Sequence, residues 1–368
     1  MAEPFKEWIN TDAIGRLADG LSTARPRWSP APFLAAATDG LQPLELKDRI
    51  RHVAAALRAH LAPDYPAAIA HILDALPPAL DGADGVTESF ELWPFCQYVE
   101  SYGLEHLELS LTAMHALTQR FSCEFAVRPF LLRYPEPVLE RLTTWSTDPS
   151  THVRRLVSEG ARPRLPWGIR LQPFVADPAP VLPLLEALKD DPELYVRRSV
   201  ANNLNDIAKD HPALVVAIAQ RWSEGASAER EKLVRHALRT LIKRGDPGAL
   251  AVLGFGPPEV DLGGFTLETE AVTLGDALAF NVTLRSTAAG SQKLLIDYAV
   301  HHQRKNGKLS PKVFKWTTRE IAAGEALTLS RRHPIRPITT RRYYPGAHKV
   351  ELLVNGASLG VLDFTLRT

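Results

Sequence analysis

The sequence has few cysteines and no long apolar run. It contains only two cysteines, Cys96 and Cys123, and neither belongs to a CxxC pair or to a Cys/His cluster with metal-ligand spacing. We therefore expect two reduced thiols and no metal site. No run of about 18 apolar residues is present, which predicts no membrane span. The N-terminal stretch carries acidic residues and no long apolar centre, so we expect no secretory signal and a cytoplasmic protein.

Familiar cofactor and catalytic motifs are also missing. The sequence has no GxGxxG dinucleotide fingerprint, no Walker phosphate loop, no HExxH zinc motif and no GxSxG nucleophile elbow. We therefore expect no cofactor. A content of 45% hydrophobic and 23% charged residues is typical of a globular chain with a full core, and 368 residues are enough for two domains.

Charge is nearly balanced over the whole chain but is unevenly distributed. The net charge of +1 combines −7 over residues 1–147, +4 over 148–244, −3 over 245–261 and +7 over 262–368. A basic second half suits a polyanionic partner such as nucleic acid. Scattered, solvated basic side chains would give the same balance, so charge alone leaves both interpretations open.

One pattern occurs twice, and it organises the helical part of the chain. Five residues return at a constant spacing of 43: Asp148, Pro149, Val153, Arg154 and Arg155 become Asp191, Pro192, Val196, Arg197 and Arg198. Such a spacing is typical of stacked helical repeats of the HEAT type. The two aspartates are predicted to lie in the N-cap regions of the repeat helices. A weaker third copy starts at residues 233–239, and its apolar face is expected to continue to Ile242.

Polar residues of the two copies are expected to come together. Glu159 in the first copy corresponds to Asn202 in the second, and Arg198, Asn202 and Asp206 lie four residues apart on one polar stripe. Because adjacent repeats stack side by side, we expect Glu159, Asn202 and Asp206 near one another on one surface. Further upstream, Glu124 is a carboxylate among apolar neighbours. It could lie at a helix start, on an exposed face or in a pocket.

From about residue 262 the hydrophobic pattern changes to strict alternation. Apolar residues occupy every second position over 278–284, 294–300 and 350–354. Roughly seven short strands without cysteine fit an immunoglobulin-like sandwich that lacks a disulfide. The expected fold is therefore mainly α, with a HEAT-like α-solenoid over residues 1–255 followed by a C-terminal immunoglobulin-like β-sandwich over 262–368. A basic hairpin tip is predicted at residues 301–308.

A resemblance to a known family can be stated on two stretches. VRRLVSEGARPRLPWG and DPELYVRRSVANNLNDIAKDHP resemble the AlkC/AlkD family of bacterial DNA alkylation repair glycosylases, which are HEAT-like solenoids. The form of the insert in the first stretch and the C-terminal sandwich point to the AlkC branch. The resemblance covers residues 1–255, and the sandwich is a known appendage of that branch. It implies excision of N3-methyladenine, with 3-methylcytosine as a second substrate, from double-stranded DNA by a monomer.

The resemblance also implies roles for individual residues. Asp206 matches the catalytic aspartate of the family, and Trp167 matches its aromatic residue beside the lesion. Glu159 and Glu124 are expected to complete an acidic pocket around the base. The chemistry is consistent with these residue types, because a cationic base leaves through an oxocarbenium-like state that carboxylates stabilise. An aromatic face attracts the cationic base. No metal or redox cofactor is needed.

Basic and polar residues along the repeats and the hairpin tip are the expected DNA contacts. They are Arg154, Arg155, Arg162, Arg164, Arg197, Arg198, Asn202, Arg239, Lys243, Arg304 and Lys305. Because HEAT scaffolds commonly use arginines for internal ion pairs, we expect about half of these cations to reach phosphates.

Two other functions remain open at this point. Helical repeats and immunoglobulin-like folds both serve as non-enzymatic protein scaffolds, and that reading predicts no affinity for DNA. A structural binder of bent or damaged DNA would bind in a salt-sensitive manner without releasing a base. The sequence also leaves open whether the lesion is flipped into a pocket or exposed by bending the duplex.

Overall fold

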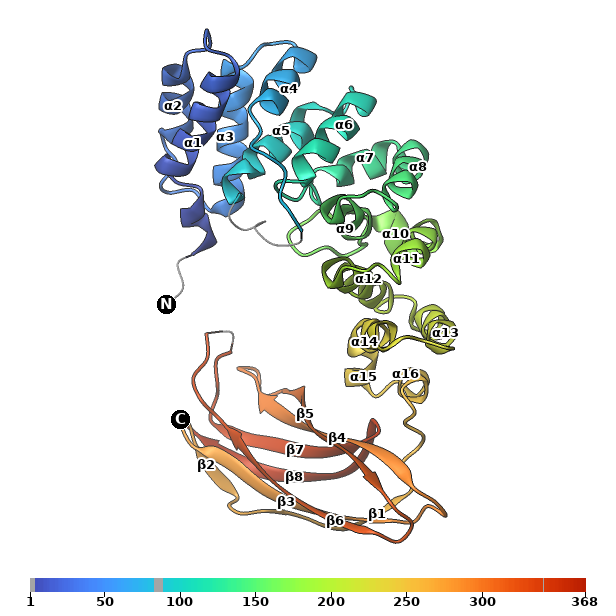
Figure 1. Ribbon diagram of the computed structural model, residues 1–368. Helices are drawn as coiled ribbons and strands as arrows, with labels where there is room; N and C mark the ends of the chain where they lie inside the picture. Colours follow the sequence, from blue (N-terminus) through green and yellow to red (C-terminus); the bar gives the residue numbers. More distant parts are fainter. Residues whose placement is uncertain (1–3, 83–88, 340) are drawn as a thin grey trace. The chain divides into compact units, whose positions relative to one another are not determined.

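The computed structural model describes residues 4–82, 89–339 and 341–368 (Figure 1). Packing divides the chain into two compact units. One consists of Met1–Asp210 with Ser227–Ala237, and the other of His211–Ala226 with Leu238–Thr368. A search of the described residues for a helix long and apolar enough to span a membrane finds none.

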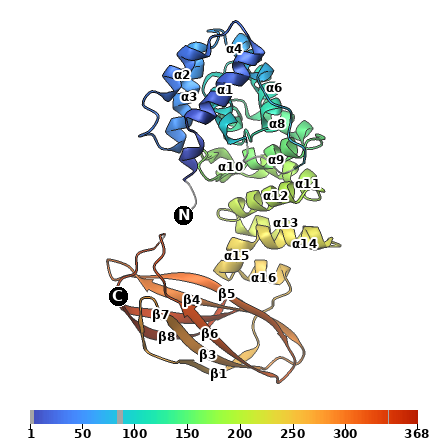
Figure 2. The ribbon, with the colours of Figure 1, turned by 60° about the vertical axis from the view of Figure 1, so that its left-hand side comes forward.

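The first unit is helical, as the sequence predicts. Its elements are η1 (Phe5–Trp8), α1 (Thr11–Ala24), α2 (Pro30–Thr38), α3 (Leu46–His60), α4 (Tyr65–Asp74), η2 (Phe90–Leu92), α5 (Trp93–Tyr102), α6 (Leu107–Thr118), α7 (Val127–Arg133), α8 (Pro135–Trp145), α9 (Thr151–Gly160), α10 (Gln172–Ala176), η3 (Ala179–Val181), α11 (Leu182–Leu188), α12 (Leu194–Ile207) and α14 (Ala228–Ala237). Neighbouring helices pack side by side along the unit (Figure 2). This is the arrangement of a helical-repeat solenoid.

Local sequence explains where these helices form. In α3 the buried residues Ile50, Val53 and Leu57 recur at spacings of three and four, so they share one face that packs into the core. Prolines stand in the first turns of α2, α4, α8 and α11. A first-turn N–H has no partner within its helix, so proline starts these helices without losing a hydrogen bond.

The two copies of the repeated pattern begin with the same turn. Asp148 Oδ1 accepts a hydrogen bond from the Ser150 N–H at 2.8 Å, and Asp191 Oδ1 accepts one from the Glu193 N–H at 2.9 Å. Ser150 and Glu193 are the N-cap residues of α9 and α12. The predicted N-cap regions are therefore correct, with each aspartate two residues before the cap itself.

The first arginine of each copy closes this turn. Arg154 Nη1 donates to the carbonyls of Asp148 (2.8 Å) and Pro149 (3.0 Å). Arg197 Nη1 donates to the corresponding carbonyls one repeat later, including that of Pro192 at 2.7 Å. Because the contacts are the same in both copies, the 43-residue spacing in the sequence reflects a true structural repeat.

The second unit contains three helices and the strands. Its elements are α13 (Pro212–Ser223), α15 (Arg239–Arg244), α16 (Pro247–Val252), β1 (Val260–Leu267), β2 (Ala271–Thr273), β3 (Ala277–Ser286), β4 (Gln292–Gln303), β5 (Leu309–Ile321), β6 (Ala326–Pro334), β7 (Gly346–Val354) and β8 (Ala357–Arg367). The apolar residues predicted to continue the third copy are buried at Leu238 and Leu241 and half-buried at Ile242, but they do not lie on one continuous helix. Helix α14 ends at Ala237, α15 begins at Arg239, and the two helices belong to different units.

The strands form the predicted immunoglobulin-like sandwich. One sheet has the order β1-β3-β6 and the other β2-β8-β7-β4-β5. Side chains such as Phe280 and Tyr298 fill the core between them. The structure has eight described strands where about seven were expected, because β2 spans only three residues and shows no alternation to detect. The β4–β5 hairpin turns at residues 304–308, so residues 301–303 belong to β4 and not to the tip.

Candidate active site

Three carboxylates from separate segments meet through two arginines. Glu124 lies just before α7, Glu159 on α9, and Asp206 on α12. Arg162 bridges two of them, because its Nη1 is 2.7 Å from Glu159 Oε1 and its Nε is 2.8 Å from Asp206 Oδ2. Arg155 Nη1 is 2.6 Å from Glu124 Oε2, and its Nη2 is 3.6 Å from Glu159 Oε1. We call these five residues the carboxylate cluster.

Helix α12 supports the cluster with one face. Tyr195, Ser199 and Asn203 are four residues apart and therefore point to the same side of the helix. The Tyr195 ring lies 4.9 Å from the Arg155 guanidinium. Ser199 Oγ donates to Glu159 Oε2 at 2.6 Å, and Asn203 Nδ2 donates to a backbone carbonyl of α9 at 2.9 Å. These contacts join α12 to α9 and fix the position of Glu159.

Glu159, Arg162 and Asp206 of the cluster are buried, while Glu124 and Arg155 are partly exposed. Glu159 is 5% exposed and Asp206 is 1% exposed. The prediction that Glu159, Asn202 and Asp206 share one open surface is therefore only half right: the two carboxylates come together, but inside the unit. Among the described residues, no hydrogen bond joins Asn202 to the cluster, and the neighbouring Asn203 faces α9 instead. A shift of one residue rotates a side chain by about 100° around a helix, which accounts for the difference.

Electrostatics keep Glu159 ionised in this setting. Burial by itself would raise the pKa of Glu159, because a buried carboxylate loses its hydration. Arg155, Arg162 and the Ser199 hydroxyl outweigh that effect, so the pKa of Glu159 is lowered. For Arg155, desolvation opposes the charged form, yet the charges of Glu124 and Glu159 raise its pKa.

A lysine covers the candidate catalytic carboxylate. Lys209 Nζ is 2.7 Å from Asp206 Oδ1, and its side chain is 36% exposed. Both oxygens of Asp206 therefore have a basic partner, Arg162 on one and Lys209 on the other. Each carboxylate oxygen can accept more than one hydrogen bond, so these partners leave acceptor capacity for a water.

Arg128, which is fully buried on α7, anchors the insert between the copies, residues 162–168. Its Nη1 donates to the carbonyls of Gly160 and Arg162, both at 2.8 Å, and its Nε donates to the carbonyl of Ile169 at 2.7 Å. Burial lowers the pKa of Arg128 to about 10. These hydrogen bonds tie both ends of residues 160–169 to α7, and this segment carries Arg162 and Trp167.

Trp167 stands out within the insert in two ways. Its side chain is 58% exposed, and its backbone φ is +65°. That left-handed conformation favours glycine and costs another residue about 1–3 kcal/mol, so it persists only where the surroundings impose it. Lys47 Nζ donates to the Trp167 carbonyl. The Phe5 ring contacts the indole at a centroid distance of 6.3 Å, with 75° between the ring planes.

The arginines expected to bind DNA fall into two groups. Several have internal partners: Arg154 pairs with Asp191 at 2.6 Å and Arg164 with Asp210 at 2.7 Å, in addition to the contacts of Arg155, Arg162 and Arg197 given above. Arg239 also has interactions within the protein. Others are exposed, namely Arg198, Lys243, Arg304 and Lys305. The expectation that about half serve internal pairing fits this division, while the DNA contacts themselves stay a prediction.

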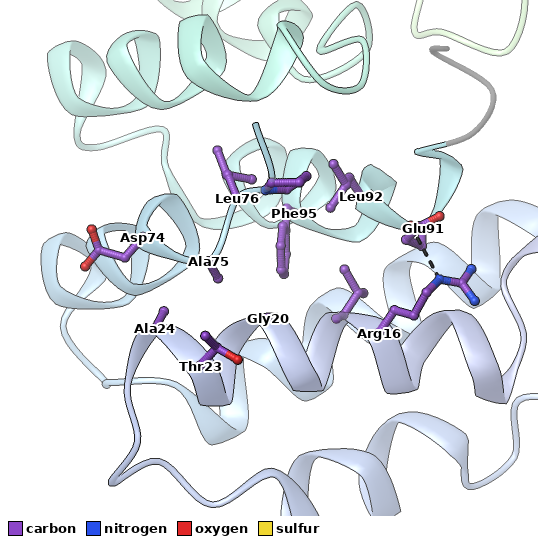
Figure 3. Close-up of a pocket in the computed structure, with 12 residues that line it drawn as sticks. Arg16, Gly20, Thr23, Ala24, Asp74, Ala75, Leu76, Glu91, Leu92 and Phe95 are labelled. Atoms are coloured by element: carbon purple, nitrogen blue, oxygen red, sulfur yellow. Dashed lines mark ion pairs between the residues drawn. The ribbon is translucent and has the colours of Figure 1, made fainter. Parts of the chain in front are cut away.

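A pocket among the described residues lies away from the carboxylate cluster. It holds about 540 Å³ and is lined by residues of α1, α5, η2 and the end of α4 (Figure 3). Leu92 and Phe95 give it an apolar wall, and an ion pair between Arg16 and Glu91, 3.5 Å long, closes one side. No side chain of the carboxylate cluster lines it.

The remaining candidate groups are a metal site and the two cysteines. In the part of the chain that the structure describes, no three His, Cys, Asp or Glu side chains are arranged to hold a metal ion. Cys96 and Cys123 are free, buried thiols with Sγ atoms 3.3 Å apart. Burial raises the pKa of Cys123, which disfavours the reactive thiolate.

Sequence reasoning missed several residues that this arrangement uses. Tyr195 and Ser199 could have been found, because they follow helical spacing on the helix of Asp206, and so could Lys209, which lies three residues after Asp206 just past the end of that helix. Arg128 and Phe5 gave no such signal. Both act across the fold, on a segment distant from them in the sequence.

Comparison with known proteins extends over both units. A family profile described as "Uncharacterised protein YhaZ, C-terminal Ig-like domain" matches residues 261–368. The chain is 38% identical over 362 residues to YhaZ of Bacillus subtilis (strain 168), and the match covers 98% of each chain. It is also similar to a solved structure, the Pseudomonas fluorescens alkylpurine DNA glycosylase AlkC bound to DNA containing an abasic site analog. That match has a TM-score of 0.90, 38% identity and full coverage of both chains.

Proposed function

Because this chain belongs to the AlkC family, we propose that it is a DNA glycosylase that removes alkylated bases from double-stranded DNA. The proposed substrates are cationic bases, N3-methyladenine first and 3-methylcytosine second. The proposal assigns the glycosylase domain to residues 1–255 and the immunoglobulin-like domain to 262–368. The observation that carries it is the convergence of Glu124, Glu159 and Asp206 beside an insert that presents an exposed tryptophan.

The reaction is hydrolysis of the N-glycosidic bond. The bond between C1′ and the base nitrogen breaks, and its electron pair leaves with the base, which becomes neutral. Positive charge develops on the sugar, and a nearby carboxylate lowers the energy of that state. Water then adds to C1′ and releases a proton. Asp206 is assigned to stabilise the sugar cation and to orient the water, because its oxygens keep acceptor capacity beside Arg162 and Lys209.

The other residues are assigned to the base. The faces of aromatic rings attract cations through their quadrupole, so Trp167 favours a methylated, positively charged base over a neutral one. Glu124 and Glu159 are assigned to complete the acidic pocket around the base, each paired with an arginine in the structure. The alkylated base is already activated as a leaving group, so these groups select the lesion and need not protonate it.

Displacement of Lys209 would leave Asp206 Oδ1 fully available to the sugar and the water. In the structure its ammonium covers Asp206 Oδ1. Its side chain is long and partly exposed, so it can turn toward solvent or a phosphate at little cost. The exposed cations Arg198, Lys243, Arg304 and Lys305 are the proposed phosphate contacts, and each adds to a salt-dependent affinity.

The first test is base release from N-methylated duplex DNA. Wild type is compared with Asp206→Asn, and Asp12→Asn, which changes an exposed aspartate of α1, is the matched control. We expect Asp206→Asn to lower the single-turnover rate by about 100-fold or more while DNA binding is retained. Circular dichroism confirms that each variant is folded.

The two other candidate functions give different results in the same assay. Salt-dependent binding without release by the wild type would replace the enzyme with a structural binder of damaged DNA. Absence of both binding and release would leave a protein scaffold. Release that is equal in wild type and Asp206→Asn would keep the glycosylase and remove Asp206 from its chemistry.

A further inference from the structure

Burial does not fix the orientation of the Trp167 ring, because the side chain is 58% exposed. The left-handed backbone at φ +65° belongs to a turn that the insert closes itself, since the Gly168 N–H donates to the Leu165 carbonyl at 3.2 Å. Two further constraints come from parts of the chain far from the insert.

The first constraint is aromatic. Phe5, on η1, meets the indole of Trp167 edge to face at 6.3 Å and 75°, a geometry that aromatic pairs favour. Phe5 is itself 51% exposed. An aromatic ring stabilises a protein mainly by being buried. A half-exposed phenylalanine that touches an exposed tryptophan therefore contributes little to the core.

A second group anchors the backbone of η1 independently of the Phe5 ring. The buried Arg49 of α3 does this, because its Nη1 donates to the carbonyls of Lys6 at 2.8 Å and Ile9 at 3.1 Å. The same nitrogen is 3.2 Å from a carboxylate oxygen of Glu7. Removing the Phe5 ring therefore leaves the backbone that carries it anchored.

The second constraint is polar. Lys47, also on α3, donates to the Trp167 carbonyl and so supports the left-handed turn. Its ammonium lies 5.2 Å from the centre of the Phe125 ring, next to Glu124. Phe125 stacks on Trp93 at 5.1 Å, and Trp93 meets Phe90, which contacts Phe5 in turn. A continuous set of ring contacts thus connects Phe5 to the segment of Glu124.

We propose that Phe5 and Lys47 are positioning residues that hold Trp167 in the orientation in which it receives a cationic base. This inference rests on the proposed function. Phe5 fixes the ring plane through the edge-to-face contact, and Lys47 fixes the backbone turn from which the ring projects. Phe5 and Trp167 together then present an aromatic surface built from the N-terminal segment and the insert.

The first part of the test needs no activity. Tryptophan emission and its quenching by acrylamide are compared between wild type and Trp167→Phe, and again between Phe5→Ala and the Phe5→Ala/Trp167→Phe double variant. Each difference isolates the signal of Trp167. We expect Trp167 to be more readily quenched, and its emission shifted, when Phe5 is absent. A purely local structural role of Phe5 would leave this difference signal unchanged.

The second part measures single-turnover base release from N-methylated duplex DNA. Phe5→Ala should lower the rate about five- to tenfold, the effect of one lost aromatic pair, and Phe5→Tyr should restore it. In a double-mutant cycle, Phe5→Ala should lower the rate little further in a protein that already carries Trp167→Ala. Lys47→Met keeps the apolar stem and should slow release in the same direction. Arg51→Met on the same helix and Leu132→Ala, which removes an exposed apolar side chain on α7, are the controls.

The outcomes separate this inference from the proposed function. If wild type releases no base, the proposed function fails, and the fluorescence comparison alone decides whether Phe5 positions Trp167. If wild type is active but Phe5→Ala changes neither quenching nor rate, positioning by Phe5 is overturned while the glycosylase stands. Additive effects of Phe5→Ala and Trp167→Ala would also overturn it.

Discussion

The two copies of the repeat share a sequence and a local structure but differ in what surrounds their second arginine. In both, an aspartate and the first arginine close the same turn. The second arginine of the first copy, Arg155, is enclosed on several sides by Glu124, Glu159 and Tyr195. Its counterpart Arg198 is exposed.

The difference shows where a repeat protein places its specialised chemistry. Contacts within one repeat follow from the repeated sequence, so they recur. Contacts between neighbouring elements depend on what each neighbour presents, and only the first copy is followed by the insert and preceded by Glu124. The positions that differ between the copies are therefore the candidates for function.

The largest expected effect comes from removing the second arginine of the first copy, and the second arginine of the other copy provides the comparison. Arg155→Met removes the shared partner of Glu124 and of the buried Glu159 and should lower the free energy of unfolding by about 3–5 kcal/mol. Arg198→Met should change it by no more than about 0.5 kcal/mol. Urea denaturation measures both. Equal losses of unfolding free energy in the two variants would contradict the difference between the two second arginines.

Arg198→Met serves a second purpose. If Arg198 contacts a phosphate, its loss should weaken binding to all duplexes and reduce the salt slope of log K by about one. A binding isotherm at several salt concentrations tests this, with Arg51→Met as a control that also removes one exposed positive charge. An unchanged slope would assign Arg198 to the solvated surface.

Glu159→Gln makes the first copy more like the second, which has Asn202 at that place. We expect the free energy of unfolding to fall by about 2–3 kcal/mol at neutral pH, because Arg155 and Arg162 lose a buried charged partner. The folded-state pKa of Glu159 lies below its ordinary value of 4.5. Its stabilisation is therefore present above about pH 4.5 and is lost as the pH falls through the lowered pKa.

The measurement is the difference in unfolding free energy between wild type and Glu159→Gln as a function of pH. This difference should be constant near neutrality and shrink in acid below pH 4.5. A difference that grows on acidification would mean that Glu159 is destabilised by its surroundings and that the sign of its pKa shift is wrong.

Substituting the first arginine of each copy should cause more similar losses of unfolding free energy. Arg154 holds its turn and also pairs with Asp191, whereas Arg197 holds only its turn among the contacts described above. We expect Arg154→Met to cost about 2 kcal/mol and Arg197→Met about 1 kcal/mol. Thermal unfolding of the two variants gives the order. A larger loss from Arg197→Met would mean that the ion pair to Asp191 adds nothing.

The smallest expected effect concerns the insert that only the first copy has. Trp167→Gly and Trp167→Ala both remove the indole, but only glycine accepts φ +65° without strain. Trp167→Gly should therefore be more stable than Trp167→Ala by about 0.5–1 kcal/mol, while both lose the proposed contact to the base. Chemical denaturation compares them. Greater stability of the alanine variant would show that the turn relaxes when the ring is absent.

Much of the fold could be predicted from the sequence, because the relevant signals are local. Helical spacing of apolar residues identified α3, alternation identified the sandwich strands, and the 43-residue spacing identified α9 and α12. The break between α14 and α15 and the three-residue strand β2 were missed. Their positions depend on packing between elements, which a local pattern does not contain.

For the candidate site, the sequence by itself determined which residue types are available and which helix carries each of them. It placed Glu159 and Asp206 on adjacent repeats, and their meeting follows from stacking. The tertiary structure alone decided that Glu159 and Asp206 are buried, that Lys209 covers Asp206, and that Phe5 meets Trp167. Burial and pairing arise between segments far apart in the chain, and the energies that select among such contacts exist only once the chain has folded.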